Sequence, residues 1–250
     1  MIVDAHVNIT EDGKWGNTGF DASVDNLLGE MDSAKVDKAL LLPVKGMGTT
    51  SHVVQTVKQH SDRFFGFGTL SIHSFEEDIQ KVVDAGLGGF KFHPRFQEES
   101  PQLLDELGIL DHLAEHGLPI MICGWLQSKT IPLQDLQPMA IDLLAKRNPG
   151  VNFIISHMGC HKYWDAFFVA RSNANVFLDC SYFLNFFKNT SLATDFYKSL
   201  HLVDQKVFFG SDFPELNIGD YLDMFLKGIA GDEAVDREAV LSGNIMKLLT

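Results

Sequence analysis

The chain has 250 residues, of which 45% are hydrophobic and 21% are charged, and its formal net charge is −13 at pH 7. This length and composition suit a globular protein with one large core or two smaller ones, and they exclude an intrinsically disordered chain. An acidic surface repels nucleic acid and anionic membranes, so we expect neither as a partner.

Cysteine content and hydropathy indicate the compartment. Three cysteines provide no disulfide framework. No basic region followed by an apolar stretch opens the chain, and no apolar run reaches the roughly 18 residues that a membrane span needs. We therefore expect a cytoplasmic protein.

Eight short apolar segments predict buried β-strands, because they are rich in Val, Ile, Leu and Phe. They are residues 2–7, 38–42, 64–70, 89–93, 119–123, 152–157, 176–180 and 206–210. Helix-like stretches between them predict helices over residues 21–34, 74–85, 103–116 and 133–146. In the second helix, Ser74 and Glu77 have the spacing of a capping box, and Gly86 is typical of a helix end.

The spacing of the strands predicts an α/β fold, a (β/α)8 TIM barrel. Strand starts recur about every 30 residues, which is the size of one strand-plus-helix unit. Eight such units fill one domain over residues 1–250. An open doubly wound sheet is the alternative, but no Gly-rich phosphate loop follows the first strand. The polar loop over residues 10–19 is either a lid over the barrel mouth or a plain surface loop.

Polar and ionisable side chains gather at the ends of the predicted strands. In the first strand Asp4, His6 and Asn8 alternate with apolar residues, which predicts that all three share one face. The carboxyl ends of barrel strands face one mouth, where barrel enzymes keep their active sites. The other candidates at strand ends are Lys91, His93, Cys123, His157, Cys180 and Asp212.

Some of these side chains are of the types that zinc prefers, namely imidazole, thiolate and carboxylate. We predict one divalent metal ion, with zinc favoured, held by His6, Cys123 and Asp212, with Asn8 as a weak neutral ligand. A hydrogen-bonding role for Asn8 and a small buried apolar role for Cys123 stay open as alternatives. His157 is the candidate acid or base, because an imidazole can titrate between about pH 5 and 8.

Positive and aromatic groups also lie near the strand ends. Lys91 and His93 share a face of the fourth strand, and Arg95 follows directly, so all three are candidate substrate-binding residues. A Lys and an Arg beside the mouth of an acidic protein predict capture of a substrate carboxylate. Trp125, just past the fifth strand, is a candidate pocket wall. A surface salt bridge for Arg95 and core packing for Trp125 are the alternatives.

Seven segments occur in an order that resembles a known family. They are residues 2–8, 89–94, 119–124, 155–159, 177–181, 209–214 and 243–249. Together they are similar to the amidohydrolase 2 branch of the amidohydrolase superfamily, which includes aminocarboxymuconate semialdehyde decarboxylase, related aromatic-acid decarboxylases and lactonases. The similarity spans the whole chain and implies a TIM barrel that acts on small molecules.

The resemblance also implies residue roles. Members of the family typically bind one metal ion through a His-x-His pair on strand one, a His on strand five and an Asp on strand eight, and a His on strand six acts as acid or base. His6, His157 and Asp212 match this pattern. Asn8 stands in place of the second His, and Cys123 stands in place of the strand-five His.

These observations together predict a hydrolase or a non-oxidative decarboxylase for a small carboxylate-bearing metabolite. Asn8 and Cys123 keep two other readings open. One is a metal-free, lactonase-like hydrolase in which Asp212 activates water directly, and the other is a non-catalytic barrel that binds a ligand. A homodimer is a common assembly for soluble enzymes and is our expectation here.

Overall fold

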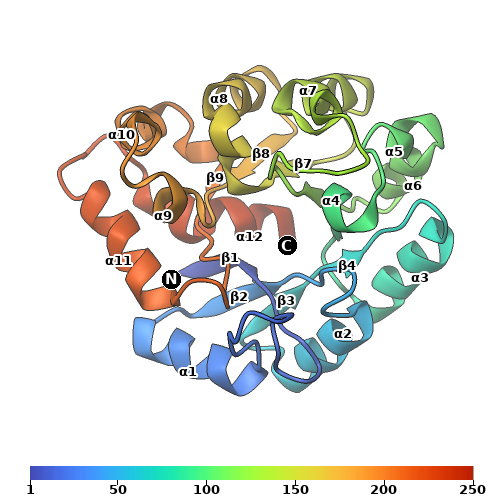
Figure 1. Cartoon of the computed structure of the whole chain (residues 1–250), viewed down its shortest axis with the longest axis horizontal. Coiled ribbons are helices and arrows are strands. Elements are labelled where there is room, and N and C mark those ends of the chain that lie inside the picture. Colours follow the sequence, from blue (N-terminus) through green and yellow to red (C-terminus); the bar gives the residue numbers. More distant parts are fainter. Residues whose placement is uncertain (250) are drawn as a thin grey trace.

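Parallel strands form a closed ring that helices surround (Figure 1). The computed structural model describes residues 1–249, and within them it contains the following strands. They are β1 (Val3–Val7), β2 (Lys38–Leu41), β3 (Phe64–Gly66), β4 (Gly68–Thr69), β5 (Phe90–Phe92), β6 (Ile120–Ile122), β7 (Phe153–Ile155), β8 (Val176–Asp179) and β9 (Val207–Phe208). Each strand pairs with its sequence neighbour in the orders β1-β2-β3 and β4 through β9.

Two lines of contact, which we call seams, join these two sheets into one barrel of eight strand positions. The predicted strand over residues 64–70 is interrupted at Phe67, so β3 and β4 together fill one strand position of the barrel. The Phe67 N–H still donates to the Leu41 carbonyl at 3.0 Å, which links this position to β2. At the other seam the Asp212 N–H donates to the His6 carbonyl at 2.9 Å. Closure of the ring confirms the predicted barrel and excludes the open doubly wound sheet.

Helices cover the outside of the ring and, in the case of α12, one of its ends. They are α1 (Val24–Ala34), α2 (Thr50–Gln59), α3 (Phe75–Ala85), α4 (Pro94–Gln97), α5 (Leu103–Glu106), α6 (Ile109–Glu115), α7 (Pro138–Arg147), α8 (Tyr163–Ser172), α9 (Phe183–Phe187), α10 (Ser191–Ser199), α11 (Ile218–Gly228) and α12 (Asn244–Leu249). Within residues 1–249 no helix has the length and hydrophobicity that a membrane crossing requires.

Two predicted helices are each split. The helix expected over residues 103–116 breaks into α5 and α6 at Gly108, which has φ = 71°, a conformation that glycine adopts without strain. The helix expected over residues 133–146 starts as a 3-10 turn, Leu133–Leu136, and α7 begins only at Pro138. Proline is suited to the first helical position, because it lacks the N–H that would be unpaired there.

The one helix cap predicted from the sequence, at Ser74, does not form as expected. Ser74 precedes α3, but its side chain makes no cap bond and instead donates to Asp78 Oδ2 at 3.2 Å. The helix ends at Gly86 in a left-handed conformation, as predicted. At α1, by contrast, Ser23 Oγ accepts from the Asn26 N–H at 3.2 Å and does cap the helix.

Two apolar layers hold the barrel together, one inside the ring and one between the ring and the helices. The inner cluster contains Val3, Ala5, Leu40, Leu42, Phe67, Met121, Ile154, Phe208 and Ile245. Ile245 comes from α12, which lies behind the middle of the ring in Figure 1. Asn244 of the same helix donates to the Val207 carbonyl at the start of β9 at 2.9 Å. Thus α12 closes the amino-terminal end and leaves the opposite end open for a site.

The predicted alternation in β1 is wrong for Asp4. Asp4 pairs with Ala39 and Val7 pairs with Leu41, so three steps along β1 match two steps along β2. Such a bulge turns Asp4 to the same side as Val7, away from the cavity that His6 lines. Asp4 is therefore buried outside the mouth, where its Oδ1 accepts from the backbone of His6.

Candidate active site

A cavity of about 180 Å³ opens at the carboxyl ends of the strands. A neighbouring hollow of about 240 Å³ shares Arg95, His157, Asp212 and Glu215 with it, so the two form one mouth. The residues that line the first are His6, Asn8, Trp15, Gly16, Thr18, Val44, Met47, Lys91, His93, Arg95, Phe96, His157, Asp212 and Glu215. The loop over residues 10–19 contributes Trp15, Gly16 and Thr18, which favours the lid over the plain surface loop.

The fourth barrel strand supplies positive charge. Lys91 is 1% exposed, and its Nζ donates to Ser156 Oγ at 2.9 Å. Burial lowers the pKa of this ammonium, although nearby anionic groups, including the Asp212 carboxylate, oppose that change. Arg95 stacks on the Phe96 ring at 4.6 Å, and its buried Nε has no hydrogen-bond partner. Arg95 lines the cavity, and a guanidinium there is a strong binding group for a carboxylate.

His6 is oriented by a carboxylate from β8. Its Nδ1 lies 2.6 Å from Asp179 Oδ2, and both side chains are buried. Burial alone would raise the pKa of Asp179, but the charge and hydrogen bond of His6 hold it well below its usual range. An ionised carboxylate can only accept, so His6 Nδ1 carries the proton. The other ring nitrogen, Nε2, is the one turned to Asp212 Oδ1, at 3.3 Å.

Ser181 links this pair to His157. Its Oγ lies 2.9 Å from Asp179 Oδ2, 3.0 Å from His6 Nδ1 and 2.9 Å from His157 Nδ1. The Ser181 carbonyl also lies 3.1 Å from His157 Nδ1. Because a carbonyl only accepts, the His157 proton sits on Nδ1 and its Nε2 carries none.

The titration of the two candidate catalytic residues differs from our expectation. Burial, and then the charge of His6, lower the pKa of His157 to about 3, so it does not titrate between pH 5 and 8 as predicted. Burial raises the pKa of Asp212 to about 6, although its side chain keeps 15% exposure. The group poised to exchange a proton near neutral pH is therefore Asp212.

Comparison with known proteins identifies the family of the chain. A family model described as Amidohydrolase matches residues 3–250. The chain belongs to the amidohydrolase family. It is thus an enzyme of that family, and the resemblance inferred from its motifs is confirmed. No curated protein matches the sequence.

Solved structures of similar fold include three at low sequence identity. An uncharacterised TIM-barrel protein from Bordetella bronchiseptica aligns with TM-score 0.80 and 17% identity, over 99% of this chain and 98% of that one. A probable 2-pyrone-4,6-dicarboxylic acid hydrolase from Acinetobacter baumannii has TM-score 0.72 and 15% identity, with coverage of 99% and 98%. The 5-carboxyvanillate decarboxylase of Sphingomonas paucimobilis has TM-score 0.72 and 14% identity, with coverage of 99% and 98%. These likenesses confirm the TIM-barrel fold.

Members of this amidohydrolase family usually hold a divalent metal ion, and one group of donors is compatible with it. The ligand atoms of His6, His157 and Asp179 lie within 4.8 Å of one another. Neutral His157 and ionised Asp179 have the protonation states that metal binding needs. However, the Ser181 hydroxyl lies at hydrogen-bond distance from all three. An ion between them would require this hydroxyl to turn away and the protons on Nδ1 of His6 and His157 to move to Nε2.

A second donor set faces the open cavity. His6 Nε2 and Asp212 Oδ1 are 3.3 Å apart, which equals the roughly 3.3 Å between two ligands of one tetrahedral ion with 2.0–2.2 Å bonds. Asn8 Oδ1 is buried without a partner, while its Nδ2 donates to the Phe213 carbonyl at 3.0 Å and to Asp212 Oδ1 at 3.4 Å. Coordination of an ion by Asn8 Oδ1 would therefore require this amide to turn over. Asp179 would then orient His6 from behind, as carboxylates commonly do for a ligating histidine. His6, Asn8 and Asp212 of the predicted ligand shell therefore come together.

The cysteines lie away from this set. Cys123 is buried, burial raises the pKa of its thiol, and it does not line the cavity. Within residues 1–249 it joins no group of three His, Cys, Asp or Glu donors, so its role as a ligand stays a prediction. Cys180 packs in the outer apolar layer instead of facing the mouth. Strand alternation turns its neighbours Asp179 and Ser181 to the site in its place.

The two remaining predicted substrate-binding residues both reach the mouth. His93 lines the cavity, its ring lies 4.5 Å from that of Phe96, and burial keeps its pKa well below the usual range. Trp125 lines the second hollow and meets the His157 ring edge-on at 6.2 Å. A core-packing role alone does not account for a Trp in that position.

Four site residues escaped the sequence analysis, namely Trp15, Asp179, Ser181 and Glu215. Asp179 and Ser181 could have been found, because they flank Cys180 at alternate positions of a strand end. The possible lid over residues 10–19 contains Trp15, but nothing in the sequence signals its contact with Glu215, because that contact depends on two loops meeting across the mouth.

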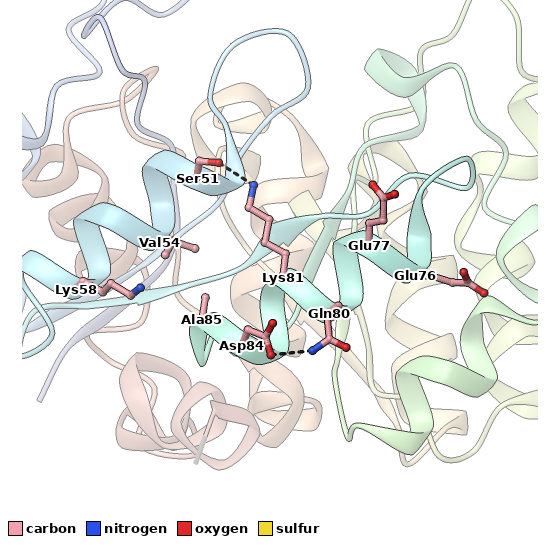
Figure 2. Close-up of a pocket in the computed structure, with 9 residues that line it drawn as sticks. All are labelled: Ser51, Val54, Lys58, Glu76, Glu77, Gln80, Lys81, Asp84 and Ala85. Carbon is pink, nitrogen blue, oxygen red and sulfur yellow. Dashed lines mark hydrogen bonds between the residues drawn. The ribbon is translucent and has the colours of Figure 1, made fainter.

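A wider hollow lies outside the barrel, between α2 and α3. Figure 2 shows that its side chains carry both charge signs, with Lys81 Nζ donating to Ser51 Oγ at 2.7 Å and Gln80 Nε2 to Asp84 Oδ1 at 2.7 Å. The lining residues come from the outer helices and none belongs to the mouth. This hollow is therefore not the candidate active site, although it is larger than the cavity at the mouth.

Proposed function

We propose that the protein is a hydrolase or a non-oxidative decarboxylase that acts on a small carboxylate-bearing compound with the help of one divalent ion, with zinc favoured. Family membership supports an enzyme of this type. Relatives of similar fold are described as a pyrone dicarboxylic acid hydrolase, a carboxyvanillate decarboxylase and a 2,6-dihydroxybenzoate decarboxylase, and these names favour a carboxylate as the substrate group.

One observation carries the proposal. A carboxyl group with a pKa of about 6, that of Asp212, faces the same cavity as Lys91 and Arg95. Hydrolysis and decarboxylation both require a proton to move at a carbon or oxygen centre, and a group with a pKa near the working pH does this best. The two cations would bind the substrate carboxylate and direct the other end of the molecule to Asp212.

The neighbouring residues have supporting roles. Asp179 fixes the tautomer and the ring orientation of His6. His157 keeps its Nε2 unprotonated, which makes it a hydrogen-bond acceptor beside the reacting group rather than an acid. Trp125 and Phe96 wall the mouth and limit the entry of water.

A divalent ion would be held by His6, Asn8 and Asp212. When bound, it would act as a Lewis acid that polarises a substrate carbonyl or carboxyl oxygen. An ion at this place would also compete with the proton on Asp212 and draw its pKa down.

A second candidate is a metal-free hydrolase in which Asp212 activates water directly. It is favoured by Asn8, which is a weak ligand, and by the Ser181 hydroxyl among the other donors. The third reading is a non-catalytic ligand-binding barrel. In such a protein the raised pKa of Asp212 would serve no catalytic purpose.

Metal content separates these candidates. We expect about one divalent ion per chain, by plasma mass spectrometry, in protein purified without added metal. His6→Ala should lose it, and Asn8→His should retain it at higher chelator concentration because imidazole is the stronger ligand. The Asp223→Asn variant, altered on the outer surface of α11, serves as the matched control. A metal-free wild type with full activity would establish the second candidate instead.

A panel of small carboxylates tests the reaction. Lactones and hydroxyaryl acids that carry a carboxylate should be scored in parallel for ring opening and for CO₂ release. Arg95→Gln should raise KM by about 10–100-fold, which corresponds to a lost charge-assisted hydrogen bond. An unchanged KM in Arg95→Gln would contradict the proposed binding mode.

A further inference from the structure

The walls of the mouth carry opposite charges. Lys91 lies on β5, the fourth position of the ring, and Arg95 follows it. Asp212 and Glu215 follow β9, the eighth position. Four positions apart in a closed ring of eight is the opposite side, so a cationic wall faces an anionic wall across the cavity that all four residues line.

Glu215 is held in place by the lid. Trp15 Nε1 donates to Glu215 Oε1 at 2.9 Å. Trp15 is only 6% exposed and packs with Ala22 and Val44 in a small apolar cluster of its own. The Glu215 N–H also donates to the Asp212 carbonyl at 3.0 Å. The carboxylate is thus fixed at the rim rather than free to turn into solvent.

No protein cation neutralises this carboxylate. Within residues 1–249 no Lys, Arg or His nitrogen lies within 4.0 Å of a Glu215 oxygen, and the Asp212 carboxyl next to it adds charge of the same sign. A carboxylate whose only side-chain donor is an indole N–H has lone pairs left for a ligand. A ligand group placed there is stabilised if it donates a hydrogen bond and is repelled if it is anionic.

We propose that Glu215, positioned by Trp15, determines substrate specificity. The site takes a monocarboxylate whose far end is a hydrogen-bond donor, such as a hydroxyl or amino group, and rejects a compound with a second carboxylate at that end. The inference rests on the proposed function in one respect, because it takes Lys91 and Arg95 as the subsite for the first carboxylate.

Two rigid acids of similar length test the proposal, 4-hydroxybenzoate and benzene-1,4-dicarboxylate, with binding to the purified protein measured by calorimetry. For the wild type we expect the dicarboxylate to bind more weakly by about tenfold or more, because like charges face each other. Glu215→Gln keeps an oxygen acceptor for Trp15 and removes the charge, so the ratio of the two Kd values should approach one. Glu76→Gln, in the outer hollow of Figure 2, should leave the ratio unchanged.

Further variants separate specificity from structure. Trp15→Phe keeps an aromatic ring but removes the N–H that holds Glu215. The ratio of the two Kd values should therefore move toward one, while the melting temperature stays near that of the wild type. Equal binding of both acids to the wild type, or an unchanged ratio in Glu215→Gln, would overturn the inference. If neither acid binds, or if Arg95→Gln leaves binding of the hydroxy acid intact, the carboxylate subsite of the proposed function fails, and the inference fails with it.

Discussion

Two carboxyl groups show how environment divides roles among identical side chains. Asp179 lies beside His6 and is held ionised, whereas burial raises the pKa of Asp212 to about 6. The first can only orient a partner, and the second can give and take a proton near neutral pH. The assignment of the proton-moving role to Asp212 depends on this difference rather than on its place in a motif.

Replacement of Asp212 tests that assignment. Asp212→Asn keeps the size of the side chain but cannot move a proton, so turnover should fall by on the order of 10²–10⁴-fold. Circular dichroism and the melting temperature should stay close to those of the wild type. Asp223→Asn, at an exposed site on α11, should keep full turnover. Near-normal turnover in Asp212→Asn would transfer the role to another group, with His157 the next candidate.

Asp4 provides a second residue-level test, of stability against pH. Burial raises its pKa from 3.8 to about 7, and its Oδ2 has no partner. Between these values the folded state holds a proton that the unfolded chain has lost. This carboxyl therefore makes stability fall as pH rises, by at most about 1.4 kcal/mol per pH unit.

The Asp4→Asn variant should lack this decline. Its free energy of unfolding in urea should change less than that of the wild type between about pH 5 and about pH 7. Because other acids titrate equally in both proteins, the difference between the two curves isolates Asp4. Parallel curves would mean that Asp4 is ionised throughout this range in the folded protein.

At the scale of helices, two serines that each precede a helix differ in structure. Ser23 caps α1 through the Asn26 N–H, whereas the Ser74 side chain bonds to Asp78. The sequence alone singled out Ser74, because Glu77 completes a capping box there. The φ of −142° and ψ of 26° at Ser74 differ from the extended conformation of Ser23 and direct the hydroxyl elsewhere.

The Ser23→Ala variant should therefore destabilise the protein more than Ser74→Ala. Loss of the Ser23 cap should cost about 1 kcal/mol, which lowers the melting temperature by about 2–4 °C for a chain of this size. Ser74→Ala removes only a part-buried side-chain bond and should have a smaller effect. Calorimetric melting of both variants checks the order, and a larger loss in Ser74→Ala would show that the local bond to Asp78 matters more than the cap.

At the scale of the whole molecule, closure of the barrel and assembly of the site are the same event. Gly210 lies where β9 meets β1, and a Cβ there would be 2.8 Å from His6 Cβ and 2.9 Å from Asp179 Oδ1. Both distances are shorter than van der Waals contact, and the neighbouring backbone belongs to the seam. Only glycine allows the two strands and the His6–Asp179 pair to come this close.

Gly210→Ala should accordingly disturb stability and ligand binding together. We expect a loss of about 1–3 kcal/mol from overpacking, with weaker retention of metal or carboxylate ligands. Gly231→Ala, where a Cβ would meet nothing within 4 Å, is the matched control and should affect neither. If Gly210→Ala melts like the wild type, the seam is more adjustable than its contacts indicate.

Patterns in the amino-acid sequence predicted the barrel and most of the side chains at its mouth. Apolar segments about 30 residues apart specify strand-plus-helix units, because each segment must be buried and each helix must cover it. Since carboxyl ends of barrel strands share one mouth, the residues at those ends, such as His6, His157 and Asp212, could be placed there without coordinates. The same reasoning placed Lys91, Arg95 and Trp125 around them.

The neighbours of these residues follow from the folded chain and not from the sequence patterns. A bulge in β1 removed Asp4 from the site, and alternation in β8 put Asp179 and Ser181 in place of Cys180. Burial beside His6 lowered the pKa of His157, and two loops met where Trp15 binds Glu215. Sequence periodicity describes one strand at a time, whereas register, burial and contacts between loops arise only when the ring closes, and these set the charge and the chemistry of the mouth.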